Sequence, residues 1–320
     1  MSAAAPMPVN RGIDDNRDKK KFSIDLLKKQ KVLILMSFPF FIWLLVFAYY
    51  PIWGWIMAFQ DFKPVLGVFG SPFVGLKHFE RMLTDGLFLE SFRNTIGQAV
   101  WQLGIGFPMP IIFALLLNEV KLIKFKKITQ TISYLPYFVS WVITVSVIST
   151  VLSTNGVLND MLIGLGIIKE PVLWLGRANI FWPIFALTDT WKNVGWNAII
   201  YLAAVVAIDP TLYEAASVDG AGRWRRMWHI TLPSITSLII ILLVLNIGHI
   251  VNVGFERQLL MGNPLVHSHS VSIDQYALEY GLGMARFSYG TAVGMFKSIV
   301  SVTLLFLANR FARKLDAGVF

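Results

Sequence analysis

Residues 214–233, EAASVDGAGRWRRMWHITLP, separate two long apolar runs and decide how this chain is interpreted. The stretch is polar, is interrupted by two glycines and carries three arginines next to two tryptophans. This composition predicts a docking surface rather than a tight hairpin between the flanking runs.

The apolar runs around this loop are too long for the core of a soluble protein. The 320-residue chain is 55% hydrophobic and 15% charged, with a mean hydropathy of +0.61, which is typical of an integral membrane protein. Because a helix needs about 20 apolar residues to cross the hydrocarbon core, we expect an all-α polytopic fold with six transmembrane helices. The six runs are residues 32–58, 94–118, 128–152, 179–207, 234–254 and 288–309. A kink is expected at Pro108 and Pro110.

The basic residues predict the orientation of these spans. Lys and Arg in short loops resist translocation. Eighteen of them fall in the two tails and in the loops at 121–127 and 208–233, and eight fall on the other side. Both termini and the 208–233 loop are therefore expected in the cytoplasm. The predicted organisation is a basic tail with an interfacial helix (1–31, the helix within 13–30), a transmembrane domain (32–314) and a short cytoplasmic tail (315–320).

The loop itself predicts two short helices joined at an elbow. Asp209 and Pro210 predict a helix start, since Asp caps free N–H groups and Pro fits the first helical position; this helix is expected to end at Val218. Gly220 then permits a sharp turn, and Pro233 is expected to open the fifth span. On composition alone, an interfacial loop with arginines on lipid phosphate fits equally well.

The order of residues favours a more specific interpretation. Glu-Ala-Ala, three residues, Gly, nine residues, Ile, one residue and Leu-Pro resembles the EAA loop of binding-protein-dependent ABC importer permeases. The matching residues are Glu214, Ala215, Ala216, Gly220, Ile230, Leu232 and Pro233. Further segments are similar to the oligosaccharide and polysaccharide branch, beside aldouronate-type and alginate-type subunits. They are FVGLKHF (73–79), Asn94-Thr95, YLPYFVSWV (134–142), GFERQLLMGNP (254–264) and SYGTAVGMFKSIVSVTLLFLANR (288–310).

This resemblance implies a permease subunit of a type I ABC importer in the bacterial inner membrane, carrying an oligosaccharide or polysaccharide, possibly an acidic one. It implies a second permease, expected to be a different but similar chain, two ATPase subunits and an extracytoplasmic solute-binding protein, besides membrane lipid. The sequence lacks a G-x-x-x-x-G-K-[ST] phosphate loop, so ATP and Mg²⁺ are expected on the ATPase and the chain is not expected to be an enzyme. In the family the EAA helix docks in a cleft of the ATPase. The implied coupling residues are Glu214, Ala215, Ala216, Asp219, Gly220, Ile230, Leu232 and Pro233.

Ionisable residues inside the spans indicate a substrate pathway, because each costs about 2.5 to 3.5 kcal/mol in hydrocarbon. Lys192 and Lys297 lie deep in their spans. Asp189 either pairs with Lys192 on one helix face or lines the pathway with it. Lys297 faces the pathway or a partner subunit, or pairs within the chain. The lysines would suit an acidic saccharide. The pathway candidates are Asp189, Lys192, Asn193, His249 and Lys297, with Asn197, Asn246 and Asn252 as weaker candidates.

Other features leave alternatives open. Residues 60–92 and 255–287 are expected on the outer side, either as a docking surface for a solute-binding protein or as solvated loops. HSHS at 267–270 has no supporting carboxylate or Cys cluster, so no metal site is expected. An ion-coupled secondary carrier would show internal repeats with broken helices, and a membrane enzyme would need a catalytic constellation. Neither pattern is found in the sequence. The net charge of +9 follows from the cytoplasmic basic residues and anionic headgroups rather than from nucleic-acid binding.

Overall fold

The computed structural model describes residues 30–314 and divides into two units, residues 1–54 and 55–320, which are described separately. The interfacial helix predicted within 13–30 lies, apart from Gln30, outside the described residues. The predicted tail at 315–320 lies outside them as well.

The first apolar run is helical throughout. It consists of α2 (Lys31–Leu44), a π-helical turn η1 (Leu45–Tyr49) and a 3-10 segment η2 (Tyr50–Phe59). These 29 residues are long and apolar enough to cross a membrane. The first unit ends within η2, at Gly54.

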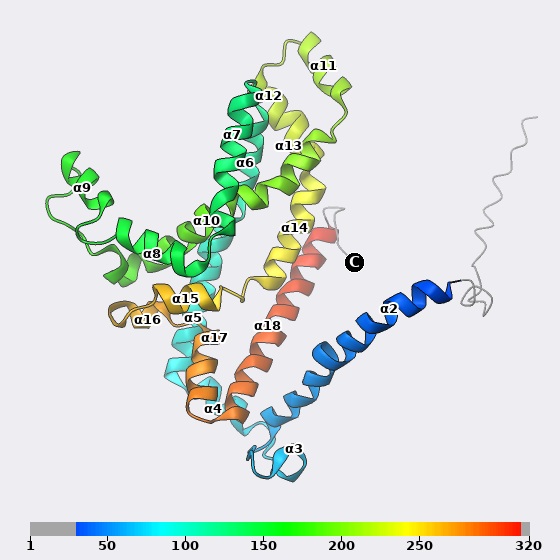
Figure 1. The fold of residues 1–320 in the computed structure, drawn as a ribbon, viewed down its shortest axis with the longest axis vertical. Helices are drawn as coiled ribbons and strands as arrows, with labels where there is room; N and C mark the ends of the chain where they lie inside the picture. Colours follow the sequence, from blue (N-terminus) through cyan, green and yellow to red (C-terminus); the bar gives the residue numbers. More distant parts are fainter. Residues whose placement is uncertain (1–29, 315–320) are drawn as a thin grey trace, which may run out of the picture. The chain divides into compact units, whose positions relative to one another are not determined.

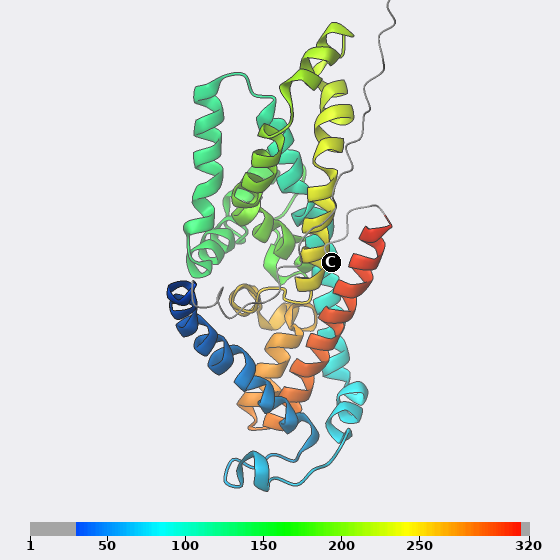
Figure 2. The same cartoon turned by 90° about the vertical axis from the view of Figure 1, so that its right-hand side faces the viewer.

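The described part of the second unit contains helices and one isolated bridge between Gln60 and Phe73. Among the described residues, three helices of the chain are long and apolar enough to span a membrane, and there are six if each of three bent pairs counts as one span. Figures 1 and 2 show α11 (Pro210–Val218) at one end of this unit and α4 (Lys77–Thr84) at the other. We call these the α11 end and the α4 end.

The second span runs from Gly86 to Asn118 without the break that its prolines would cause in isolation. Asp85 caps α5 (Gly86–Trp101) by accepting hydrogen bonds from two backbone N–H groups. A π-helical turn, η3 (Gln102–Gly106), then precedes α6 (Pro108–Asn118). Since proline has no N–H to donate, the wider turn accommodates the missing hydrogen bonds.

The prediction of a continuous span over 128–152 is wrong. α7 (Ile123–Tyr134) continues into a 3-10 turn, η4 (Leu135–Phe138), and α8 (Trp141–Val151) then leaves at 108° to it. Val139 is extended, and Ser140 caps α8 by accepting from the Ile143 N–H. At the break, the Pro136 carbonyl of η4 still accepts from the Val139 N–H at 3.2 Å, and the chain leaves helical geometry at Val139. A short helix, α9 (Val157–Gly164), and a 3-10 turn, η5 (Trp174–Gly176), follow.

α10 (Ala178–Val206) is the central helix and packs against α5, η3, α6 and α7. Its contact with α7 is close: a Cβ on Gly195 would lie 2.1 Å from the Ser133 carbonyl oxygen. After α11, the chain forms α12 (Arg223–Arg226), a π-helical turn η6 (Met227–Thr231) and α13 (Leu232–Ser234). α14 (Thr236–His249) follows a 60° bend. Pro233 therefore lies inside α13, before the bend, and does not open the long helix as predicted.

Short helices follow α14 in the sequence and precede the last span. They are α15 (Phe255–Met261), η7 (Pro264–Val266), α16 (His267–Ser270), α17 (Ile273–Tyr276) and the π-helical η8 (Ala277–Gly283). α18 (Phe287–Arg313) closes the chain and packs on α14, η8 and α4. The 60–92 region holds α3 (Gly67–Gly70) and α4.

Buried apolar clusters lie at three levels of this unit. One joins α6, α10 and the start of α14, a second joins α4, α5, α17 and α18, and a third joins α5, α8 and α10. The polar cavity described below lies where these elements meet.

Candidate functional site

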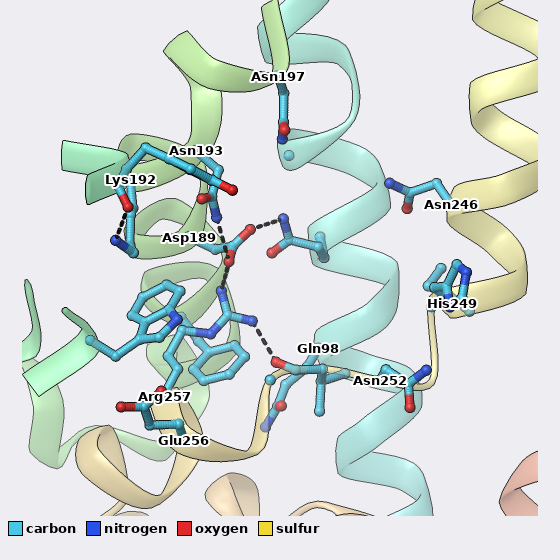
Figure 3. Close-up of a pocket in the computed structure, with 18 of the residues that line it drawn as sticks. Gln98, Asp189, Lys192, Asn193, Asn197, Asn246, His249, Asn252, Glu256 and Arg257 are labelled. Carbon is cyan, nitrogen blue, oxygen red and sulfur yellow. Dashed lines mark hydrogen bonds and ion pairs between the residues drawn. The ribbon is translucent and has the colours of Figure 1, made fainter. Parts of the chain in front are cut away.

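A polar cavity of about 640 Å³ lies between η3, α10, the end of α14 and the segment that leads into α15. Figure 3 shows carboxylate, guanidinium and amide groups from these elements turned toward one another. Placing so many polar groups inside a membrane domain costs free energy, so their concentration here indicates a functional site.

Asp189 on α10 is at the centre of the polar network. One of its carboxylate oxygens accepts from Asn193 Nδ2 at 3.0 Å, and the other accepts from Gln102 Nε2 at 2.5 Å. Its Oδ1 also lies 2.5 Å from Arg257 Nη1 in an ion pair. The sequence placed Asp189 among the pathway candidates but did not identify this partner.

Arg257 on α15 is almost completely buried, with 4% of its side chain exposed. Its guanidinium lies 3.8 Å from the ring centre of Phe185 and 5.2 Å from that of Trp141, and Nη2 donates to the Val253 carbonyl at 2.5 Å. The topology count from the sequence places Arg257 in the outer loop at 255–287, either on a docking surface or in a solvated loop. The structure corrects this, because α15 folds back against α8 and brings the guanidinium to α10.

Lys192 lines the same cavity but does not pair with Asp189. Its ammonium group donates to the carbonyls of Pro136 and Tyr137, each at 2.9 Å, and to that of Val139. These are carbonyls at the break between η4 and α8. The ammonium thus binds the carbonyls at the point where helical geometry ends, and the Pro136 carbonyl also accepts from the Val139 N–H.

The remaining polar lining is uncharged except for Glu256. It comprises Gln98, Gln102, Asn193, Asn197, Asn246, His249, Asn252 and Ser140. A second hollow of about 430 Å³ shares Gly106, Asn197, Asn246 and His249 with the first and continues between α6, α10 and α14. Tyr137 and Trp196 stack with ring centres 4.3 Å apart, and each lines one of the two hollows. The two hollows therefore form one path with amide and aromatic walls.

Lys297 lies outside both of these hollows. Its ammonium group is 2.5 Å from Asp274 Oδ1, which belongs to α17. Of the alternatives open from the sequence, the pair within the chain is the one that the structure contains, with Asp274 rather than Asp189 as the partner. Four pathway candidates thus surround one cavity, namely Asp189, Lys192, Asn193 and His249.

The second candidate site is the loop at the α11 end. Asp209 caps α11 by accepting from Thr211 N at 2.9 Å, and this hydrogen bond lowers the pKa of the carboxyl group. Gly220 adopts φ +72°, a conformation that favours glycine, at the predicted elbow. No residue of α11 is buried. Glu214, Ala215 and Asp219 are exposed and Ala216 is partly exposed, so the helix presents a free face.

Two side-chain contacts connect the two arms of the elbow. The Tyr213 hydroxyl lies 2.9 Å from Thr231 Oγ1, and Arg226 Nη1 donates to Ser217 Oγ at 2.8 Å. Ile230 and Leu232 are partly buried, and Pro233 is exposed. The sequence predicted the elbow but not these contacts, because short-range patterns do not specify which side chains meet across a turn.

No group of three or more His, Asp or Glu side chains within residues 30–314 is placed to hold a metal ion. Of the charged groups that line the cavity, Asp189 pairs with Arg257 and Lys192 donates to backbone carbonyls, whereas Glu256 is exposed.

An all-helical membrane domain with a polar cavity and an exposed loop helix defines a transport component. The family model for the binding-protein-dependent transport system inner membrane component matches residues 20–320. The chain therefore belongs to this family, of which an EAA loop is typical; the sequence predicts that loop at residues 214–233.

Close relatives cover the whole chain. The polygalacturonan/rhamnogalacturonan transport system permease protein YteP of Bacillus subtilis (strain 168) is 44% identical over 321 residues, 100% of this chain and 99% of that protein. Protein LplB of the same organism is 43% identical over 92% of each chain. These matches make this chain a permease subunit of an ABC importer and argue against an ion-coupled carrier or an enzyme.

Solved structures agree with this assignment. A chain of a bacterial ABC transporter involved in the import of the acidic polysaccharide alginate has a TM-score of 0.83 and 38% identity, over 91% of this chain and 98% of that one. A chain of the bacterial alginate transporter in complex with an alginate pentasaccharide-bound periplasmic protein has a TM-score of 0.84 and 37% identity, over 92% and 98%. The predicted fold class, six-span organisation aside, is thus confirmed.

Proposed function

We propose that this subunit conducts a carboxylate-bearing oligosaccharide from an extracytoplasmic solute-binding protein to the cytoplasm, driven by separate ATPase subunits. The names of its relatives support the substrate class, since polygalacturonan and alginate are both polymers of sugar acids. The complex would contain a second, different permease and two ATPase subunits, and ATP with Mg²⁺ would bind to the ATPases alone.

The polar cavity is the observation that carries the proposal. Its walls combine amide side chains, which bond sugar hydroxyls, with the rings of Tyr137, Trp141 and Phe185. Amide donors and acceptors suit a chain of hydroxyl groups, and aromatic faces suit the apolar faces of pyranose rings. The cavity continues between α6, α10 and α14 toward the α11 end, which gives the saccharide a path.

The exposed face of α11 is the proposed contact with the ATPase. Ala215 and Ala216 are small enough to allow close approach, and Glu214 supplies a carboxylate for a basic group of the partner. Gly220 lets the helix turn relative to α12. We assign α11, the basic loops at 121–127 and 223–226 and both termini to the cytoplasm, because Lys and Arg in short loops resist translocation.

Uptake in proteoliposomes tests the proposal. The complex is purified with its native partners, reconstituted with ATP inside, and supplied with its binding protein and radiolabelled galacturonate or mannuronate oligomers. We expect ATP-dependent accumulation of at least one of these sugar acids. Equal accumulation without ATP, or uptake of neutral oligosaccharides alone, would overturn the proposed function.

A further inference from the structure

Two cationic side chains, Lys192 and Arg257, line the cavity, and they differ in how their donors are used. The Lys192 ammonium has three N–H groups and three backbone carbonyl partners, so it has no donor left for a ligand. Arg257 has five N–H groups. Nη2 donates to the Val253 carbonyl, and Nη1 lies 2.5 Å from Asp189 Oδ1 in an ion pair. Nη1 and Nε are both buried, and neither makes a well-formed hydrogen bond with the described residues.

The aromatic rings hold the guanidinium in a fixed orientation. Phe185 packs against it with the ring centre 3.8 Å away, and Trp141 lies 5.2 Å away. A cation so packed keeps its charge available at the edge of its plane, where all its N–H groups point. The fork geometry of guanidinium matches a carboxylate through two parallel hydrogen bonds.

Asp189 occupies that edge, but it does not depend on Arg257 alone. Gln102 and Asn193 donate to its carboxylate at 2.5 and 3.0 Å. Its side chain is 19% exposed, against 4% for Arg257. Gln102 and Asn193 would therefore still donate hydrogen bonds to Asp189 if its ion pair with Arg257 opened. This lowers the free-energy cost of replacing Asp189 at Arg257 by another carboxylate.

We propose that a saccharide carboxylate entering the cavity replaces Asp189 at Arg257, so that Arg257 selects sugar acids and Asp189 competes with them for its guanidinium. This inference rests on the proposed function and identifies Arg257 as the residue that recognises the negative charge of the substrate. It replaces the expectation that Lys192 and Lys297 do so, since both ammonium groups have partners within the chain.

Direct binding to the purified permease–ATPase complex tests the exchange, because the binding protein then imposes no selection of its own. Equilibrium dialysis measures Kd for a labelled galacturonate trisaccharide and for its carboxyl-reduced, neutral counterpart. Arg257→Gln is expected to weaken binding of the acid about 10- to 100-fold, the range for a charge-assisted hydrogen bond. Asp189→Asn removes the competitor and is expected to tighten binding of the acid about tenfold. Neither variant should change Kd for the neutral sugar by more than about twofold.

Lys297→Gln is the matched control, because it removes a cation that is also paired with an aspartate but lies outside the cavity. It should leave both Kd values unchanged. If Arg257→Gln does not fold, Asp189→Asn still decides, since a purely structural ion pair predicts no gain in affinity for the acid. Equal changes for both sugars in the two variants would overturn the inference alone. A wild-type complex that binds neither sugar would overturn the proposed function with it.

Discussion

Lys192 places its positive charge at a break in a helix. Its three donors meet the carbonyls of Pro136, Tyr137 and Val139, and only 5% of its surface is exposed. A lysine inside a span is usually interpreted as part of a pathway. Here three hydrogen bonds to backbone carbonyls at the break offset the cost of burying the charge.

Lys192→Met is therefore expected to reduce stability. The substitution keeps a long unbranched side chain but removes all three donors to the carbonyls at the break, for an expected loss of about 2 to 4 kcal/mol. Thermal unfolding of the detergent-solubilised protein measures the effect, with the exposed Lys169→Met as control. An unchanged unfolding temperature combined with lost uptake would instead assign Lys192 to the substrate.

Asp85 is a second residue whose role is structural. Burial raises the pKa of its carboxyl group, but hydrogen bonds from Tyr276, from the N–H groups of Leu87 and Phe88 and from Tyr289 outweigh burial. The net pKa therefore lies below the usual value of 3.8. A depressed pKa in the folded state means that the stabilisation is present above pH 3.8 and is lost as the pH falls below it.

Asp85→Ala removes the cap of α5 and the acceptor of the Tyr276 hydroxyl. We expect a loss of about 1 to 2 kcal/mol at neutral pH. Unfolding measured between pH 3 and pH 7 should show the difference from the wild type shrinking as the pH falls below 3.8. Asp61→Ala, which changes an exposed carboxylate, is the control. A difference that stays constant with pH would contradict the role of the ionised carboxylate.

At the scale of elements, α11 and α12 form an elbow whose geometry depends on one residue. Gly220 has φ +72° and open space around its Cα, so a side chain there is opposed by backbone conformation and not by a clash. Gly222 also has open space but an ordinary φ of −68°. Substitutions at Gly220 and Gly222 therefore distinguish the effect of backbone strain from the effect of side-chain size.

Gly220→Pro should disrupt the elbow, because proline fixes φ near −65° and cannot adopt the positive value. We expect normal insertion of the protein, with ATP hydrolysis no longer coupled to uptake. Gly222→Ala should remain coupled. Glu214→Ala, which removes the proposed contact with the ATPase, should also weaken coupling without affecting insertion. The ratio of sugar imported to ATP hydrolysed measures the effect, and normal ratios in both Gly220→Pro and Glu214→Ala would exclude α11 as the coupling element.

At the scale of the whole molecule, local patterns predicted most elements and few of their contacts. The bounds predicted from the apolar runs near 179–207 and 288–309 agree closely with those of α10 and α18, because length and hydrophobicity alone define a span. Asp209, Pro210 and Gly220 similarly determine their own turn geometry.

What the sequence did not predict depends on contacts between distant segments. The ion pair between Asp189 and Arg257 joins α10 to a short helix that folds back from α14, and no periodicity indicates that return. The break at Val139 lies in a run whose hydrophobicity is continuous; only Pro136 and Ser140 mark it. Lys192, from a different helix, donates to the Val139 carbonyl at this break.

The free face of α11 and the cavity between α10 and α14 both indicate that this chain acts within a larger complex. No residue of α11 is buried, although its Leu212 and Val218 are apolar, and Val218 is 88% exposed.

Extraction in mild detergent should therefore recover the chain with an ATPase and a second, different permease, identified by mass and by ATP hydrolysis. Glu214→Ala should lose most of the ATPase but keep the second permease, since α11 is proposed to contact only the former. Asp160→Ala, an exposed carboxylate on α9, provides the control. Recovery of the chain alone, or with another copy of itself and no ATPase, would contradict this assembly.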